Sequence, residues 1–428
     1  MLSPNDPRRT NKRGLKSTRR RLRYAFSRVM SRIWPRTIYD KMLREVFISS
    51  DHAFQPGPQF EEIDPTIGEG KTPAAKVIAF YLPQFHEFEE NNRNWGAGFT
   101  EWTNIARNIP RYQGQIAPRT PRDLGYYNLM HGDIQKRQAK MARDAGVHGF
   151  CYYYYRFDEE PFMDGPIKRM LADPSVDFPF CVMWCNETWT RAWIGKDRSI
   201  IAEQQYSASV MEALVDDLAI LFNDPRYIRI QGRPLFTIYR PNFLPDADAK
   251  IAQLRKMFQE HHGLDVLFTM AQTDHAVDPR PYGLDGAIEF TANKFNKHLS
   301  KVMDPARFYD TSYSSKVYDF DELIELSLAE HHNDYPLVRS VMPHWDKNPR
   351  QPGRGHVIHG STPQKFENWT SELINRSEES LFFGERLLFV NAWNEWAESA
   401  YLEPDTHFGG AYLNSVARAV FRNPLTQR

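Results

Sequence analysis

Eight short runs of β-branched and aromatic residues, separated by longer amphipathic stretches, set the strongest limit on how this chain can fold. Strands bounded by Gly or Pro and separated by helical patterns indicate βαβ units and a parallel sheet. Eight such units predict an α/β fold, a (β/α)8 TIM-type barrel with long loops. Periodicity alone leaves an open doubly wound sheet as the alternative. The runs cover residues 77–82, 149–155, 180–185, 235–239, 266–271, 286–290, 338–343 and 387–393, and helical patterns cover 134–145, 210–222, 249–261, 320–330 and 363–375.

The charged residues divide the chain into a basic N-terminal part and an acidic remainder. The chain holds 54 Lys+Arg and 54 Asp+Glu, yet residues 1–46 carry 14 basic and three acidic side chains. That part has a charge of +11, so the remainder has −11. Apolar residues recur at helical spacing among the arginines, which predicts a basic amphipathic helix over residues 18–34. The apolar positions are Leu22, Phe26, Val29, Met30 and Ile33.

The change in composition along the chain also predicts its domains. Residues 50–75 are rich in Pro and Gly, including Pro56-Gly57-Pro58, and such stretches are typical of linkers. We therefore predict a basic amphipathic N-terminal arm over residues 1–49, a linker over 50–75 and a catalytic domain over 76–428.

The basic arm predicts an anionic partner. Each Lys or Arg near an anionic bilayer contributes about 1 kcal/mol, and an apolar stripe among basic residues suits a membrane surface. We expect residues 18–34 to meet such a surface, with a solvated tail as the alternative. Nucleic acid is not expected as a partner, because the acidic remainder would repel a polyanion.

Cysteine usage and hydropathy predict the compartment. No run approaches the roughly 18 apolar residues of a spanning helix, and no apolar signal-peptide core follows the N-terminal charges. Cys151, Cys181 and Cys185 form neither a disulfide framework nor a zinc spacing. These features predict core thiols in a reducing compartment. The expected location is cytoplasmic, peripheral at the inner face of the plasma membrane.

Polar and aromatic side chains gather directly after the predicted strands. Asn186-Glu187-Thr188-Trp189 follow the third run, and His344-Trp345-Asp346 follow the seventh. Because active sites of (β/α)8 barrels lie at the carboxyl ends of the strands, this placement predicts a site there. Polar strand ends without a function are the alternative.

Two carboxylates, Glu395 and Glu398, come directly after the last predicted strand. In an extended chain they would point to opposite faces, but a turn near Asn394 brings both into the barrel mouth. A carboxylate pair is the minimal equipment for glycoside hydrolysis, and two close carboxylates raise the proton affinity of one of them. The aromatic neighbours Trp393 and Trp396 suit the apolar faces of a sugar. As a bare pattern, two glutamates three residues apart are common in solvated helices.

Several motifs resemble a known family. The string Trp393-Asn394-Glu395-Trp396, followed by Glu398 and by Glu403-Pro404, resembles the signature of glycoside hydrolase family 99. Further motifs are similar to those of the WbsX-like proteins, bacterial proteins with a family-99-like domain linked to O-antigen, capsule or other surface-polysaccharide production. The resemblance covers roughly residues 75–415 and excludes the basic arm. The further motifs lie at residues 79–86, 95–102, 121–129, 184–187 and 409–412.

The resemblance implies a (β/α)8 fold, a retaining glycosidase mechanism and no metal or other cofactor. It implies that Glu395 takes the proton from the sugar 2-hydroxyl, so that this oxygen attacks C1, and that Glu398 is the general acid and later the base. Ala397 and Ser399 stand where family 99 has His and Gly, which puts mannose specificity in doubt. Glycosyltransferase is a common label for the WbsX-like group, and fold analogy does not settle the reaction.

The remaining candidates are residues at strand ends and in the first loop, which we predict to contact an oligo- or polysaccharide. Core packing is the alternative for the aromatic ones, and an ordinary loop histidine is the alternative for His86. A metal site built from His86, His275 and His344 lacks a recognised ligand spacing, so none is expected. The predicted substrate-binding residues are Tyr81, His86, Trp95, Glu101, Trp102, Tyr154, Trp184, Asn186, Glu187, Trp189, His344, Trp345, Trp393, Asn394 and Trp396.

Two rival functions stay open. A glycosyltransferase of O-antigen or capsule synthesis would use Asp-x-Asp to hold a cation against a diphosphate. The triplets starting at Asp246 and Asp319 both precede amphipathic runs, where helix capping explains them. A non-catalytic glycan- or membrane-binding protein is the second rival. The sequence favours an enzyme that cleaves, or transfers within, a cell-surface polysaccharide or its precursor.

Overall fold

The fold is seen in a computed structural model that describes residues 36–158, 160–195, 198–273, 276–302, 308–330 and 334–422. The predicted basic helix over residues 18–34 lies outside these residues, so its membrane partner stays a prediction. Within the described ranges, no helix combines the length and apolarity needed to cross a bilayer.

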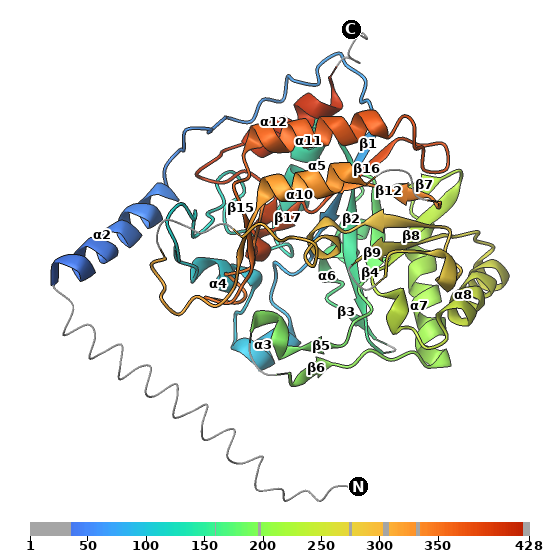
Figure 1. The fold of residues 1–428 in the computed structure, drawn as a ribbon. Coiled ribbons are helices and arrows are strands. Elements are labelled where there is room, and N and C mark those ends of the chain that lie inside the picture. Colours follow the sequence, from blue (N-terminus) through green and yellow to red (C-terminus); the bar gives the residue numbers. More distant parts are fainter. Residues whose placement is uncertain are drawn as a thin grey trace, which may run out of the picture.

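A parallel sheet lies at the centre of the molecule and is surrounded by helices (Figure 1). Its main path runs β12-β10-β9-β8-β4-β2-β1-β16-β13, and each neighbouring pair on this path is parallel. The strands are β1 Lys76–Tyr81, β2 Val147–Arg156, β4 Phe180–Trp184, β8 Arg233–Ile238, β9 Leu267–Gln272, β10 Gly286–Glu289, β12 Leu337–Val338, β13 Ser340–Val341 and β16 Leu387–Val390. The eight predicted runs are thus confirmed as strands of one sheet.

The sheet closes through a single stretch of chain. β12 pairs with β10 at one end of the path, and β13 pairs with β16 at the other. Only Arg339 separates β12 from β13, so residues 337–341 form one bent seventh strand that joins both ends. The predicted (β/α)8 barrel is therefore confirmed, and the open doubly wound sheet is excluded.

Helices follow most strands, as the amphipathic patterns predict. Their ends carry local signals: Ser207 accepts a hydrogen bond from the Val210 N–H at the start of α7, and Thr362 does the same for Lys365 in α11. Gly263 ends α8 in the left-handed conformation (φ 65°), which glycine adopts readily. The helices after β1 are α3 Glu89–Trp95, α4 Glu101–Ala106, α5 Ile134–Asp144, α6 Gly165–Ala172, α7 Ala208–Phe222, α8 Ala247–His262, α9 Thr291–Lys294, α10 Phe320–Ala329, α11 Pro363–Arg376 and α12 Ala411–Val420.

Shorter elements decorate the loops. One antiparallel pair, β17 with β18, directly follows the last barrel strand. The additional strands are β3 Pro161–Phe162, β5 Trp189–Thr190, β6 Ile200–Ala202, β7 Arg229–Ile230, β11 Val317–Asp319, β14 Trp345–Asp346, β15 Val357–His359, β17 Asn394–Glu395 and β18 Ala400–Tyr401, and the short 3-10 helices are η1 Arg191–Ile194, η2 Pro241–Phe243, η3 Arg280–Tyr282 and η4 Trp396–Glu398.

Aromatic rings fill the barrel. Phe80 of β1 is fully buried, and its ring centroid lies 5.1 Å from those of Phe290 and Phe389 and 6.0 Å from that of Tyr153. Tyr153 comes from β2 and Phe389 from β16, and Phe290 directly follows β10. Packing from opposite sides of the barrel thus makes a solid interior, and any ligand must bind above it at the strand ends.

The chain ahead of β1 also contacts the barrel. α2 Arg36–His52 runs past residue 49, where the predicted arm ends, and projects from the edge of the molecule (Figure 1). In the following segment, the Gly57 N–H donates to the His407 carbonyl at 2.8 Å and the Ala74 N–H to the Val420 carbonyl at 2.8 Å. Glu61 forms an ion pair with Arg418 at 2.8 Å. The stretch predicted as a linker therefore contacts residues 407–420, which include α12, through backbone hydrogen bonds and an ion pair.

Candidate active site

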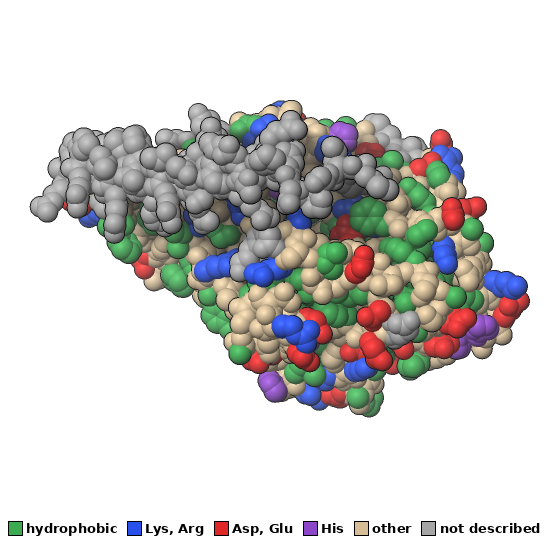
Figure 2. Space-filling view, turned by 90° about the horizontal axis from the view of Figure 1, so that it is seen from below, with side chains coloured by type: hydrophobic (Ala, Val, Ile, Leu, Met, Phe, Trp, Pro, Cys, Tyr) green, Lys and Arg blue, Asp and Glu red, His purple; other side chains and the backbone are tan. Residues whose placement is uncertain are grey.

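A pocket of about 430 Å³ opens at the carboxyl ends of the barrel strands. β5, which carries Trp189 of the pocket wall, lies below the sheet in Figure 1. Figure 2 views the molecule from this end, and basic and acidic side chains are interspersed over its described surface. The pocket is lined by Leu82, Gln84, Tyr153, Tyr155, Met183, Cys185, Glu187, Thr188, Trp189, Thr190, Trp193, Tyr239, Phe243, Phe290, Asn293, Trp345, Lys347, Arg350, Glu395 and Glu398.

A tight turn brings the two carboxylates to the same pocket. Glu395 ends β17, Glu398 ends η4, and Ser399 then adopts a left-handed conformation (φ 54°). β18 pairs antiparallel with β17, so the chain reverses within a few residues. Glu395 and Glu398 are buried, with 4% and 9% exposure, and both line the pocket. The reversal overcomes the opposite orientation that the i, i+3 spacing would give in an extended strand.

Arg350 joins the two carboxylates. Its Nη2 lies 3.0 Å from Glu395 Oε2, and its Nη1 lies 2.7 Å from Glu398 Oε1. Its Nε lies 3.3 Å from Oε2 of Glu101, a fully buried residue of α4. Lys347 adds a second cation, with Nζ 3.2 Å from Glu398 Oε1. The guanidinium fork therefore fixes the relative positions of the carboxylates.

This arrangement separates the proton affinities of the two carboxylates. Burial raises the pKa of Glu395 to about 8, with Glu398 and Glu101 adding to the rise and Arg350 opposing it. Burial also disfavours ionised Glu398, but Lys347 and Arg350 outweigh it and lower the pKa of that carboxyl. The surroundings therefore raise the proton affinity of Glu395 and lower that of Glu398.

Indole rings form one wall of the pocket. The rings of Trp189 and Trp193 stack with centroids 5.4 Å apart and planes 12° apart. The Arg350 guanidinium lies 5.2 Å from the Trp193 ring centroid. Trp345, in β14, lies across from Lys347, whose Nζ is 6.0 Å from the ring centroid. Flat apolar surfaces beside charged hydrogen-bonding groups are the combination that a sugar ring requires, since it presents both CH faces and hydroxyls.

A buried network beneath the turn holds the carboxylates in place. Glu403 accepts hydrogen bonds from Trp396 Nε1 at 2.6 Å, Gln138 Nε2 at 2.7 Å and the Tyr127 hydroxyl at 3.0 Å. Burial raises the pKa of Glu403 to about 7, and the hydrogen bonds from Trp396 and Gln138 oppose that rise. Tyr81 joins through its hydroxyl, which donates to Gln138 Oε1 at 2.7 Å.

Asn394 ties the same turn to the first barrel strand. Its Oδ1 accepts from the Leu82 N–H at 2.7 Å, and its Nδ2 donates to the Leu82 carbonyl at 3.1 Å. Three predicted substrate contacts, Tyr81, Asn394 and Trp396, are thus part of the support below the pocket and not of its lining.

The structure brings five predicted site residues into the pocket and leaves the rest outside its lining. Those in the lining are Glu187, Trp189, Trp345, Glu395 and Glu398. Glu101 acts on the pair through Arg350, and Trp95 packs edge-on against Trp193 at 6.1 Å.

Most of the others are held by contacts within the barrel wall and its loops. Tyr154 donates its hydroxyl to Asp217 at 3.3 Å, and Asn186 Nδ2 donates to the Arg240 carbonyl at 2.8 Å. His344 packs between two tyrosine rings, and burial, with Arg119 nearby, lowers its pKa well below the usual value. Also buried outside the pocket lining are His86, Trp102, Trp184 and Trp393.

Sequence reasoning missed several lining residues, and simple signals would have found some of them. Lys347 and Arg350 follow the seventh strand, where the strand-end rule used for His344 applies equally. Tyr153 and Tyr155 lie one residue on either side of the predicted Tyr154, and the two-residue period of a strand places them on the opposite face. Gln84 follows the first run, where the same rule applies, and Trp193 lies in the short 3-10 helix η1.

The two Asp-x-Asp triplets lie outside the pocket. Asp319 caps α10 by accepting from the Asp321 N–H at 2.9 Å, as predicted. Asp246 takes the N-cap position of α8 but makes no capping hydrogen bond there, so side-chain capping is wrong for this residue. With Asp248 it lines a separate hollow. His275, one of three histidines considered for a metal, lies outside the described residues.

Comparison with known proteins adds family information. A family model described as "Glycosyltransferase WbsX" matches residues 77–416. Two proteins described as uncharacterized protein WxcX, from two strains of Xanthomonas campestris pv. campestris, are 35% identical over 354 and 359 residues, 83% and 84% of this chain. These residues are 51% of each relative, so the chain spans about half the length of the curated relatives it matches.

Solved structures show a similar fold. One described as a glycoside hydrolase-like protein superimposes with a TM-score of 0.51 and 13% identity, covering 87% of this chain and 99% of that chain. The GH99 endo-alpha-mannosidase from Bacteroides thetaiotaomicron gives a TM-score of 0.49 and 14% identity over 80% of this chain and 96% of its own. The first likeness agrees with the barrel seen here.

Proposed function

The chain belongs to the WbsX glycosyltransferase family, and from that membership and the pocket we propose that it is a carbohydrate-active enzyme acting on an oligo- or polysaccharide. The observation that carries the proposal is the pair of buried carboxylates, Glu395 and Glu398, joined by Arg350 beside a wall of indole rings. A carboxylate pair that shares one proton can donate it to a leaving oxygen and accept it back.

We assign the pair a retaining, glycosidase-type cleavage or transglycosylation of a cell-surface polysaccharide or its precursor. One carboxyl protonates the departing glycosidic oxygen, while the other, as carboxylate, removes the proton of the sugar 2-hydroxyl. The freed oxygen forms a bond to C1 as the bond to the leaving group breaks. Attack by water or by another sugar hydroxyl then reopens the three-membered ring, returns the proton and restores the original configuration at C1.

The charge distribution of the free site bears on which glutamate has which role. The family resemblance gives the base role to Glu395 and the acid role to Glu398, whereas in the free site the pKa of Glu395 is raised and that of Glu398 is lowered. We propose that the pair works as a unit whose proton sits on Glu395 before substrate enters. An activated aryl leaving group departs without being protonated. Substrates that carry one therefore restore turnover only in the variant that has lost the proton donor. Rescue of Glu395→Gln alone would assign the acid role to Glu395.

A second candidate, transfer from a nucleotide sugar, is favoured by the family description and by two cations in the pocket. Lys347 and Arg350 line it and supply positive charge that a diphosphate leaving group requires. This route needs no Asp-x-Asp motif, which agrees with the position of Asp248 in a separate hollow.

One experiment separates the two reactions. The full chain is incubated with surface polysaccharides and defined oligosaccharides, and in parallel with nucleotide sugars plus acceptors, with products followed by NMR. We expect new reducing ends or rearranged glycans with retained anomeric configuration, and loss of both in Glu398→Gln. Sugar transfer from nucleotide donors without action on any glycan would contradict the glycosidase-type proposal, and loss of that transfer in Asp248→Ala would point to a metal-dependent transferase.

The substrate itself can be sought with an inactive variant. Glu398→Gln keeps the pocket shape and removes the charge of one carboxylate, so it should retain bound glycan without turnover. Screening this variant on a glycan array identifies the sugar and linkage. Absence of binding by both wild type and variant to every glycan would count against a polysaccharide substrate.

A further inference from the structure

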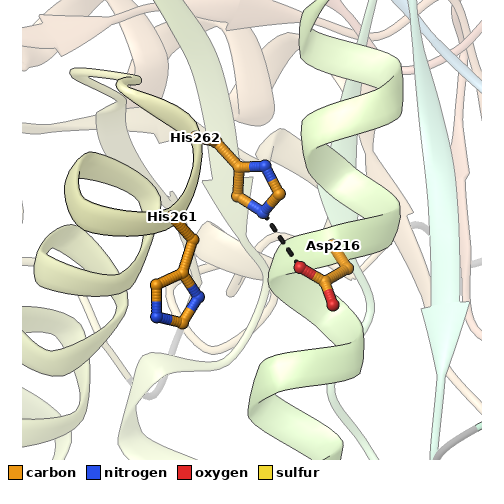
Figure 3. Close-up of side chains that lie close together, drawn as sticks. All are labelled: Asp216, His261 and His262. Atoms are coloured by element: carbon orange, nitrogen blue, oxygen red, sulfur yellow. Dashed lines mark hydrogen bonds and ion pairs between the residues drawn. The ribbon is translucent and has the colours of Figure 1, made fainter.

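Two helices on the outside of the barrel bring a carboxylate and two imidazoles together. Asp216 lies in the middle of α7, and His261 and His262 are the last two residues of α8. The helices run side by side, and Figure 3 shows the two histidines beside Asp216 in the space between them. The cluster shares no residue with the carboxylate pocket.

The three side chains have donor atoms in ligand-like proximity. His262 Nε2 lies 2.9 Å from Asp216 Oδ1, and one ligand atom from each of the three residues lies within 4.8 Å of the others. Asp216 and His261 are exposed, and His262 is half-buried. Because Asp216 and His261 are exposed, torsional changes of these two side chains can bring all three donors onto one ion at the usual Zn–N and Zn–O distances of about 2.0–2.2 Å.

We propose that Asp216, His261 and His262 form a binding site for a divalent transition-metal ion, with Zn²⁺ as the ion that suits these donors. Two imidazole nitrogens and one carboxylate oxygen are the mixed set that Zn²⁺ accepts in tetrahedral coordination. Mg²⁺ and Ca²⁺ prefer oxygen ligands throughout. The site therefore discriminates by donor type.

The surroundings favour a cation at this position. His261 and His262 form the end of α8, and Gly263 closes the helix, so the negative end of the helix dipole faces the site. Three protein ligands leave the fourth tetrahedral position for water or for a group from another molecule. A bound ion would link α7 to α8 and add its binding free energy to the stability of this side of the barrel.

The test uses the tag-free full chain, because a polyhistidine tag would bind the same ions. Calorimetric titration with ZnCl₂ is expected to show one site that is lost in the double variant His261→Ala/His262→Ala. Asp216→Asn, which keeps the shape of the side chain, should weaken binding at least about tenfold, since even outer-shell partners of zinc ligands are worth roughly 10–100-fold. MgCl₂ in place of ZnCl₂ should give no binding at this site.

Thermal unfolding gives a second measurement that requires no enzyme assay. The Zn²⁺ concentration that saturates the wild type should raise its Tm by roughly 3 °C, should raise that of Asp216→Asn by less, and should leave that of the double histidine variant unchanged. His131→Ala and His298→Ala, which remove exposed histidines elsewhere, are the matched controls and should behave like the wild type. Zn²⁺ affinity that is equal in the wild type and the double histidine variant, or no Zn²⁺ binding by the wild type, would overturn the proposal.

Discussion

Two buried clusters of acids and bases in this barrel have different balances of charge. Around the closing strand, Glu289 pairs with Lys294 at 2.9 Å and Arg339 at 3.1 Å, and both cations also contact Glu330. At the pocket, Arg350 pairs with Glu395, Glu398 and, outside the lining, Glu101, and Lys347 pairs with Glu398. Among the described residues, the first cluster has two acids for two bases, and the second has three acids for two bases.

The difference appears in the proton affinities. Burial disfavours ionised Glu289, but Arg339, Lys294 and the Ser340 N–H outweigh it and lower the pKa. In the pocket, burial prevails at Glu395 and raises its pKa to about 8. A balanced cluster holds its charges fixed and stabilises the fold, whereas an unbalanced one retains an exchangeable proton, which acid–base chemistry requires.

The largest expected effect is loss of turnover when the unbalanced cluster loses an acid. Glu398→Gln should lower the rate by about 10²–10⁴-fold, the usual contribution of a general acid–base residue, and barely change the thermal unfolding curve. Initial rates on the identified glycan and calorimetric melting measure the two effects. Glu372→Gln, in an exposed pair with Arg376 on α11, serves as the control and should change neither. A fully active Glu398→Gln would end the catalytic assignment.

The balanced cluster should show the opposite response. Glu289→Gln leaves Lys294 and Arg339 with Glu330 alone, and breaking a buried pair costs about 3–5 kcal/mol of unfolding free energy. Urea unfolding measures the loss, and activity per folded molecule should stay near that of the wild type.

The control for Glu289→Gln is Glu325→Gln, which removes an exposed pair with Lys301 and should cost less than about 1 kcal/mol. If Glu289→Gln gives too little folded protein, Glu330→Gln perturbs the same cluster from its more exposed side. Unchanged stability in both variants would remove the contrast between the clusters.

Removing the shared cation of the pocket should move the pH dependence. Arg350 lowers the pKa of both Glu395 and Glu398, so Arg350→Met should shift both limbs of the pH–rate profile to higher pH. We expect a rate loss of about 10–100-fold from misplacement of the carboxylates. Arg350→Lys keeps the positive charge but loses the guanidinium fork. It should return the two limbs of the pH–rate profile towards their wild-type positions, while the rate recovers less. Limbs that stay in place would mean that Arg350 does not set the charge of the pair.

The remaining expected effect concerns stability against pH. Folded Glu395 has a pKa of about 8, against an ordinary value of 4.5 for a glutamate in the unfolded chain, so the folded state binds more protons between these values. The stabilisation from protonated Glu395 is complete below about pH 4.5 and is lost as pH rises towards 8. Glu395→Gln should therefore unfold with less pH dependence than the wild type over this range. Parallel stability curves for the two proteins would indicate an ordinary carboxylate.

The fold was readable from sequence because each strand is short, apolar and set off by a helix pattern. The bend in the seventh strand was not, since residues 338–343 read as one uninterrupted run and only the pairing partners reveal two halves. Glu395 and Glu398 could be predicted from the sequence because they adjoin a strand end. Arg350 reaches them from 45 residues away in sequence, and such a contact depends on closure of the barrel. Trp393 and Trp396 share the aromatic character of Trp189, and only burial separates packing from lining.

The bent strand 337–341 also bears on how relatives of this protein can diverge. It carries Arg339 of one charge cluster and leads, within nine residues of Val341, to Arg350 of the other. An insertion or deletion in this stretch would displace the cations of the pocket, whereas surface loops elsewhere tolerate changes in length at little cost. Selection in such a barrel acts on a spacing as well as on side chains, so relatives are expected to vary in loop length while keeping the interval from the closing strand to this arginine constant.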